Sequence, residues 1–248
     1  MRISVITAVK NGARHIERCL HSVRGQSFPA FEHIVIDSCS SDGTSEIVRR
    51  NMYAGLRHFI RNDSGIADGW NRGLNLASGD VVAILNADDY YRSDALGLTV
   101  ETLARRPEAG VTYGDTLFVN QAGVVSSCHR GVWSPGNLFR GIGFMHPSCF
   151  VRREVYGAVG VFDTSWRYAM DCDWLIRAFR QRVVFAKSPA RVYMSSGGLS
   201  DTRWRDARAE YLAILRHHYP KRYCMHAAAV LYVALESVLK RVRRVNAS

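Results

Sequence analysis

The sequence lacks paired cysteines, a long apolar run and a leader-like start. Its six cysteines are scattered without a C-x-x-C pair or zinc-finger spacing, which favours free thiols in a reducing compartment over a disulfide or zinc framework. No stretch reaches the ~20 apolar residues of a membrane span. Residues 3–9 already read as a strand. A signal peptide would need a longer apolar region and a cleavage site, so we expect none.

Acidic residues are the minority among the charged ones. The 248 residues include 22 Asp and Glu against 33 Lys and Arg, a formal net charge of +11. Such an excess favours an anionic partner: nucleic acid, nucleotide phosphates or an acidic membrane surface. We find no recognition helix, zinc finger or RNA-binding aromatic motif, and therefore expect no nucleic-acid partner. Hydrophobic residues make up 47% of the chain, as in an ordinary globular protein.

Strand-like and helix-like segments alternate over the first ~90 residues, which predicts an α/β fold with a mostly parallel sheet flanked by helices. The apolar runs are residues 3–9, 33–37, 56–60 and 81–85. Further strands are predicted at 110–114, 116–119 and 124–128, with a hairpin turn at 120–123. Residues 131–147 read as a loop that shapes a cleft. Helices are predicted at 171–182 and 201–219, and a last apolar helix follows Pro220.

Two adjacent carboxylates, Asp88 and Asp89, follow the strand predicted at residues 81–85. Their charges repel unless a cation lies beside them, and hard divalent ions bind a few protein carboxylates together with phosphate oxygens. The pair therefore predicts a metal and phosphate site. The alternative is a solvated turn before the helix that Ser93 and Asp94 would start. Asn11, Asp37 and Asn86 also follow strands, at the sheet edge where such folds bind ligands.

Several motifs in a fixed order resemble those of the family 2 glycosyltransferases, and more narrowly the bacterial cell-surface polysaccharide branch. They cover roughly residues 3–200. The matching segments are SVITAVKN (4–11), SV (22–23), QSF (26–28), VIDSCSSDGT (35–44), SGIADGWNRG (64–73), ASGD (77–80), LNADD (85–89), FD (162–163) and AMDCD (169–173).

This resemblance implies a GT-A fold, in which a nucleotide-binding α/β sheet is fused to an acceptor-binding part. We expect a nucleotide-sugar-binding half at residues 1–115, an acceptor-binding half with the catalytic base at 116–200, and C-terminal helices at 201–248. It also implies an Mn²⁺ or Mg²⁺ cofactor. Asp89 would bind the metal, which neutralises the diphosphate as it leaves, with Asp88 beside it facing the donor.

The resemblance also assigns other residues of this chain to the binding of the nucleotide-sugar donor. Asp37 would hydrogen-bond the nucleobase; the alternative is a turn-capping role. Many members have a second Asp where this chain has Ser38, so the base identity stays open. Asp68 and Arg72 would approach the nucleotide, and the alternative for them is a surface ion pair one helical turn apart. The remaining donor-site candidates are Thr7, Asn11 and Asn86.

Asp171 is the expected general base, since the family places its base just before an amphipathic helix and six positions ahead of an Arg, here Arg177. Inversion needs one carboxylate that takes the proton from the acceptor hydroxyl. Asp173 is the rival, although two residues later it would point half a turn away. Capping of the helix by Asp171 is the alternative and is compatible with catalysis.

His146 and Trp174 are further acceptor-side candidates, together with Asp173. A tryptophan can stack on the apolar face of a sugar, although such residues more often pack in a core. Residues 197–200 resemble a late family block whose glycines would let a loop close over the donor.

The last helix suits attachment to an anionic membrane surface, because residues 227–235 are nearly all apolar and Lys240, Arg241, Arg243 and Arg244 follow. Packing of this helix on the domain or in a dimer is the alternative. The overall expectation is an inverting transferase acting on a saccharide or lipid-linked acceptor in cell-surface polysaccharide or glycolipid synthesis. It would be cytoplasmic and peripheral on the inner face of the plasma membrane. The competing hypothesis is a non-catalytic nucleotide-sugar-binding module of the same fold.

Overall fold

A computed structural model describes residues 1–120, 122–198 and 202–245. Its sheet has the strand order β3-β2-β1-β4-β8-β6-β9-β5, with β7 paired to β6. The strands β1 to β4, β6 and β9 run in one direction, while β8, β5 and β7 are antiparallel to their neighbours. The strands are β1 (Ile3–Val9), β2 (Glu32–Asp37), β3 (Leu56–Ile60), β4 (Val81–Ile84), β5 (Tyr90–Tyr91), β6 (Ala109–Val119), β7 (Val125–His129), β8 (Cys149–Arg152) and β9 (Val184–Ser195).

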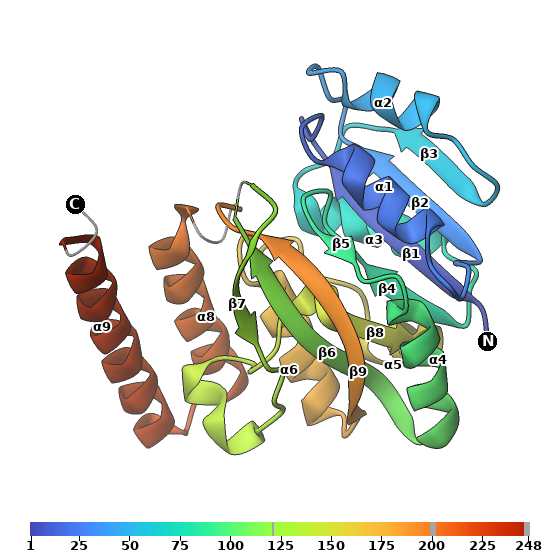
Figure 1. Cartoon of the computed structure of the whole chain (residues 1–248). Coiled ribbons are helices and arrows are strands. Elements are labelled where there is room, and N and C mark those ends of the chain that lie inside the picture. Colours follow the sequence, from blue (N-terminus) through green and yellow to red (C-terminus); the bar gives the residue numbers. More distant parts are fainter. Residues whose placement is uncertain (121, 199–201, 246–248) are drawn as a thin grey trace.

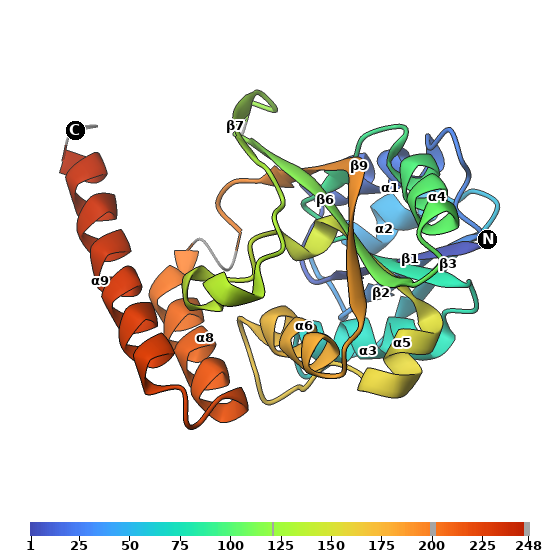
Figure 2. The same cartoon turned by 90° about the horizontal axis from the view of Figure 1, so that it is seen from below.

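Helices cover both faces of the sheet, and a pair of C-terminal helices stands beyond one end (Figures 1 and 2). One face carries α1 (Ile16–Arg24), α2 (Thr44–Arg50) and α4 (Ala95–Arg105). The other carries α3 (Ile66–Leu76), α5 (Arg153–Val159) and α6 (Met170–Arg180). The remaining elements are the 3₁₀ turns η1 (Pro135–Arg140) and η2 (His146–Ser148) and the helices α8 (Trp204–His218) and α9 (Tyr223–Val245).

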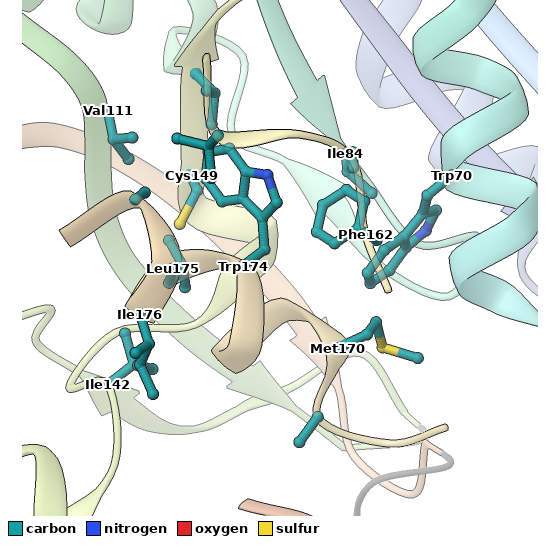
Figure 3. Close-up of a cluster of buried hydrophobic side chains, with 14 of the residues drawn as sticks. Trp70, Ile84, Val111, Ile142, Cys149, Phe162, Met170, Trp174, Leu175 and Ile176 are labelled. Carbon is teal, nitrogen blue, oxygen red and sulfur yellow. The ribbon is translucent and has the colours of Figure 1, made fainter. Parts of the chain in front are cut away.

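Two hydrophobic cores follow from these layers, one on each face of the sheet. Figure 3 shows part of the core beneath α6, where Trp174 is wholly buried among Cys149, Phe162 and Leu175. The indole nitrogen of Trp174 donates a hydrogen bond to the carbonyl of Gly160 at 2.7 Å. This core therefore uses both the apolar face and the one polar atom of the largest side chain in α6.

The predicted alternation of the first ~90 residues is confirmed, and β1 and β3 have the predicted bounds. The two strands predicted at 110–114 and 116–119 are instead the single strand β6, which crosses residue 115 and pairs with β8 and β9. The elements β5, β8, α5 and β9 were not predicted, and the predicted loop 131–147 contains η1 and the start of η2. Gln121 of the predicted hairpin turn and residues 199–201 lie outside the described residues.

In the sequence, β6 resembles two strands because Gly114 interrupts its apolar pattern. Opposite it, β9 bulges: Tyr113 pairs with Lys187 and Asp115 with Arg191. A Cβ atom on Gly114 would lie 2.2 Å from the carbonyl oxygen of Ala190. Such a contact with backbone cannot relax cheaply, so only glycine fits at this point of the strand.

We expect Gly114→Ala to lower the free energy of unfolding by at least about 1–3 kcal/mol, the usual cost of overpacking a well-packed site. Gly157→Ala in α5 is the control, because nothing lies within 4 Å of its added Cβ. Alanine should leave that helix equally stable or more stable by up to about 1 kcal/mol. Urea unfolding of both variants measures the difference, and equal losses would contradict the role of the β9 bulge.

Candidate active site

The polar residues predicted to share one edge of the sheet do so. Asn11 follows β1, Asp37 ends β2 and Asn86 follows β4, and these strands are parallel neighbours. The loops after β1 and β2 are also joined: the Asn11 amide donates to the Ser40 hydroxyl at 2.8 Å, and the Ser41 amide donates to Asn11 Oδ1 at 2.9 Å. Asn11 is exposed with a φ of 53°. Its role towards a donor stays a prediction.

Asp37 lies under this edge rather than on it. Its side chain has no exposed surface, and its carboxylate accepts hydrogen bonds from the Ser40 amide at 2.9 Å and from the Ser45 hydroxyl. Burial alone would raise the pKa of Asp37, but these hydrogen bonds and the nearby His58 lower it below the usual value. Asp37 therefore shapes the turn before α2, as the alternative expected. Its contact with a nucleobase stays a prediction.

Thr7 is also a buried residue, so the structure contradicts its assignment to the donor site. Its hydroxyl shares hydrogen bonds with His33 Nε2 at 3.0 Å and with the Cys19 thiol at 3.7 Å. His33 Nδ1 in turn lies 2.7 Å from the Tyr53 hydroxyl. Burial lowers the pKa of His33 to about 3, so the ring is neutral at physiological pH. Thr7 stabilises the core between β1 and β2.

The two carboxylates after β4 have different environments. Asp89 is buried, with Oδ1 accepting from the Ser195 amide and Oδ2 from the Asn86 side chain, both at 3.1 Å. Burial, and then the charge of Asp88, raise the pKa of Asp89 well above its usual value. Asp88 is partly exposed, and its Oδ2 lies 3.4 Å from the position of an added Cβ on Gly198. Asp88 is therefore the more exposed carboxylate of the pair.

Arg18 of α1 holds the turn that carries this pair. Its guanidinium donates to the carbonyl oxygen of Asp88 at 3.1 Å and to the Ser195 hydroxyl at 2.8 Å. It also lies 4.2 Å from the ring centroid of Tyr90, and the Tyr90 ring stacks on Tyr193 with centroids 4.6 Å apart. Because Tyr90 and Tyr193 are paired residues of β5 and β9, the turn, the helix and the last strand are fixed together.

A basic cavity of about 290 Å³ opens beside this turn. Arg14, His15 and Arg18 line it from the start of α1, and the opposite wall comes from the end of β9 and the β6–β7 hairpin through Asn120, Ser195, Ser196 and Gly197. Burial lowers the pKa of His15, the charge of Asp88 raises it, and Arg18 and Arg14 lower it further. These effects place Asp88, both arginines and His15 within electrostatic reach of one another. The concentration of positive charge suits an anionic ligand.

Sequence reasoning missed this cavity. The available signal was three basic residues within five positions after the first strand. It was weak because a basic residue on a helix usually faces solvent, and because the opposite wall comes from Asn120 and from residues 195–197, both far away in the sequence.

Asp68 and Arg72 form the ion pair that was the alternative to a donor contact. Arg72 Nε and Nη2 each donate to the Asp68 carboxylate at 3.1 Å, and the Ser64 amide donates to it at 3.0 Å. These bonds lower the pKa of Asp68, the Arg72 hydrogen bond being the largest cause. Both side chains keep some exposure at the start of α3. Their approach to a donor stays a prediction.

Asp171 lies at the start of α6, on the face of the sheet opposite to α1, and is partly exposed. Its Oδ1 accepts a hydrogen bond from the adjacent Cys172 amide at 2.8 Å. The alternative of an N-cap role for Asp171 is wrong, because the N-cap of α6 is Ala169. His146 is within electrostatic reach of Asp171. The His146 ring is buried and stacks on Trp70 with centroids 5.0 Å apart, and its Nδ1 has no hydrogen-bond partner. The pKa of His146 is lowered, because burial outweighs the raising effect of the Asp171 charge.

Two of the acceptor-side candidates are core residues, and the structure contradicts their predicted role. Trp174 has no exposed surface and cannot stack on a sugar. Asp173 is buried and accepts hydrogen bonds from Arg177 Nε at 2.8 Å and His218 Nε2 at 2.7 Å. Burial would raise the pKa of Asp173, but these two partners lower it. Of the two carboxylates, only Asp171 keeps exposed surface, and its role as the base stays a prediction.

The family model described as "Glycosyl transferase family 2" matches residues 4–157. A "PGL/p-HBAD biosynthesis glycosyltransferase" of Mycobacterium bovis (strain BCG / Pasteur 1173P2) is 29% identical over 208 residues, 80% of this chain and 79% of that protein. The "Putative teichuronic acid biosynthesis glycosyltransferase TuaG" of Bacillus subtilis (strain 168) is 37% identical over 107 residues, 42% of each.

Solved structures agree on the fold. S. aureus TarS 1-349 in complex with UDP superposes with a TM-score of 0.65 and 19% identity, covering 94% of this chain and 71% of that one. The mannosyltransferase PcManGT from Pyrobaculum calidifontis, in complex with GDP-Man and Mn²⁺, gives a TM-score of 0.67 and 21% identity, covering 96% and 75%. These neighbours show that the chain has the GT-A fold.

Proposed function

Because the chain belongs to the family 2 glycosyltransferases, we propose that it moves a sugar, with inversion, from a nucleotide-diphosphate donor to a saccharide or lipid-linked acceptor. The names of its relatives, which refer to PGL/p-HBAD biosynthesis and to teichuronic acid biosynthesis, support an acceptor of the cell surface. The observation that carries the proposal is the basic cavity that adjoins the Asp88-Asp89 turn at the carboxyl edge of the sheet.

The diphosphate of the donor fits this cavity by charge. Arg14 and Arg18 supply positive charge, and these two residues together with His15 supply hydrogen-bond donors from one helix start, which itself favours anions. Arginine in particular binds phosphate oxygens in a bidentate manner. As the bond to the sugar breaks, negative charge grows on the leaving diphosphate, and fixed donors aimed at it stabilise that charge.

A divalent cation, Mn²⁺ or Mg²⁺, would lie between the carboxylate turn and the diphosphate. We assign its protein ligand to Asp88 instead of the predicted Asp89, because Asp89 is buried with both oxygens in hydrogen bonds. Asn86 Oδ1, buried without a hydrogen-bond partner, is a second oxygen in the same turn. The described residues contain no group of three or more His, Cys, Asp or Glu that could hold a metal. This sparse donor set fits an ion completed by phosphate oxygens and water, which would neutralise the departing diphosphate.

Asp171 is the proposed general base. One of its oxygens is engaged by the Cys172 amide, which orients the carboxylate and leaves the second oxygen for the acceptor hydroxyl. Proton removal by Asp171 makes that hydroxyl a better nucleophile as it attacks the anomeric carbon from the face opposite the diphosphate. The bond to the diphosphate breaks in the same displacement, and the configuration at the anomeric carbon inverts.

Asp171→Asn should leave donor binding within about twofold and lower kcat by at least about 10²-fold, the usual range for a lost general base. Asp80→Asn is the matched control. That carboxylate pairs with the Arg2 amide at the amino end of β4, away from the carboxyl edge, and its variant should turn over normally. Transfer assays with UDP- and GDP-sugars on an acceptor extract, beside calorimetry of donor binding, measure both quantities. Substantial turnover by the Asn variant would refute the base assignment.

Asp88→Asn should weaken Mn²⁺-dependent binding of UDP or GDP by more than about tenfold, while metal-free nucleotide binding stays the same. Calorimetry with each nucleotide, with Mn²⁺ and then with EDTA, separates the two contributions. Asp89→Asn is the comparison: it should lower thermal stability, because Asp89 bonds both Asn86 and Ser195. If only the Asp89 variant loses Mn²⁺-dependent nucleotide binding, and its Tm is unchanged, then Asp89 is the metal ligand, as the sequence predicted.

The helix α9 supports attachment to a membrane surface. Within the described part of the chain, no helix is long and apolar enough to cross a bilayer. The inner side of α9 is held by Glu236, whose carboxylate accepts two 2.9 Å hydrogen bonds from Arg208 of α8, so one face packs on protein as the alternative expected. Its outer side is an apolar stripe of Tyr223, Cys224, Ala227, Val230, Leu231, Ala234 and Leu235, all exposed.

Helical spacing aligns these residues on one face, and apolar stripes of this kind enter the headgroup region of a bilayer. The basic residues Lys240, Arg241, Arg243 and Arg244 that follow would meet anionic lipids; their side chains lie outside the described part. We therefore propose a peripheral enzyme on the cytoplasmic face of the plasma membrane.

Exchanging Leu231 and Leu235, which are 75% and 58% exposed, for glutamate should abolish co-flotation with vesicles of phosphatidylglycerol and phosphatidylethanolamine. Apolar area is removed and negative charge is brought to an anionic surface. The control is Met52→Glu, at a position that is 49% exposed and lies just after α2. Because α2 is at the opposite end of the molecule from α9 (Figure 1), this variant should float like the wild type. Undiminished flotation of the double variant would eliminate α9 as the anchor.

A further inference from the structure

Glu210 of α8 makes an unusual set of hydrogen bonds to the chain just before α6. Its Oε1 accepts from the Arg167 amide at 2.7 Å. Its Oε2 accepts from the Tyr168 amide at 2.6 Å and from the Ala169 amide at 2.7 Å. Three consecutive backbone N–H groups therefore converge on one carboxylate that lies 41 to 43 residues later in the sequence.

These contacts fix the point at which α6 begins. Ala169 is the N-cap of α6 and has no side chain that could accept a hydrogen bond. The amides around a helix N-terminus lack partners within the helix and attract negative charge. Glu210 supplies both the missing acceptor and the charge from a neighbouring helix. Hydrogen bonds to an ionised acceptor are among the stronger ones in proteins, and this set ends two residues before Asp171.

A second contact joins the same two helices one turn further along α6. The buried Asp173 accepts from His218 Nε2 at 2.7 Å, and Arg180 Nη1 lies 3.1 Å from His218 Nδ1. An arginine can only donate, so Nδ1 accepts and His218 carries its proton on Nε2, directed at Asp173. With Glu210 at the start of α6 and His218 along it, α8 constrains both the translation and the rotation of α6 (Figure 2).

We propose that Glu210 is a positioning residue for Asp171, so that α8 sets the geometry of proton removal at the active site. The proposal rests on Asp171 as the general base. Asp171 is bonded to its own helix through Cys172, so its carboxylate moves with the first turn of α6. When Glu210 is lost, the segment 167–169 loses three acceptors at once and that turn is released. An error of about 1 Å in the placement of a catalytic group is enough to cost roughly 10²-fold in rate.

The test compares Glu210→Ala and Glu210→Gln with the wild type. We expect the Ala variant to lower kcat by about 10- to 100-fold, with donor affinity and donor-binding stoichiometry unchanged. The Gln variant should recover part of the loss, because its carbonyl oxygen can still accept from Tyr168 and Ala169. The matched control is Glu236→Gln, which removes the charge of another bidentate carboxylate on these helices. It does not touch residues 167–171, and it should keep full kcat on a water-soluble acceptor.

The possible outcomes separate positioning from stability and from the proposed function itself. A Glu210→Ala protein with kcat within twofold of the wild type overturns the proposal. So does a fall in kcat that is matched by a fall in donor-binding stoichiometry, since Glu210 would then only maintain the folded fraction. An equal loss in Glu236→Gln would have the same meaning. If instead Asp171→Asn turns over normally, the base assignment fails independently of any Glu210 result.

Discussion

The hydrogen bond from the Ser195 amide to the buried Asp89 carboxylate connects the middle of the sheet with its far end. Asp89 follows β4, whereas Ser195 ends β9, and β8 and β6 lie between those strands. The short strand β5, which begins at the next residue, pairs with β9 at Tyr193. The end of the sheet therefore turns back towards α1. Arg18 of that helix joins the turn after β4 to the end of β9 by donating hydrogen bonds to Asp88 and Ser195. The basic cavity exists because of this closure.

The same contact decides which carboxylate of the pair keeps exposed surface. Each carboxylate oxygen of Asp89 accepts a hydrogen bond inside the protein, and burial together with the charge of Asp88 opposes its ionisation. Asp88 keeps its exposure on the turn that Asp89 anchors. Of two adjacent and chemically identical side chains, one is thus buried as structural support and the other stays partly exposed, where we propose that it binds the metal. A comparable division holds in α6, where Asp173 is bonded to Arg177 and His218 while Asp171 remains accessible.

The C-terminal helices α8 and α9 are linked to the segment that carries Asp171. Through Glu210 and His218, α8 contacts the chain on either side of Asp171, and through Arg208 it holds α9. The orientation of Glu236 towards Arg208 leaves an uninterrupted apolar stripe on the outside of α9. In the sequence, the same glutamate reads as a break in an apolar surface. The paired helices thus connect the acceptor-side carboxylate to the surface that we propose to face lipid.

The sequence by itself determined the strand and helix alternation up to residue 85, the polar residues at strand ends and the family motifs that carry Asp88, Asp89 and Asp171. These features are local or are ordered along the chain, so periodicity and spacing report them. Only the tertiary structure decided that Thr7, Asp37 and Trp174 are buried, that Arg14, His15 and Arg18 face a cavity, and that Glu210 holds the start of α6. Exposure and such contacts depend on which distant segments pack together, and no local pattern records that choice.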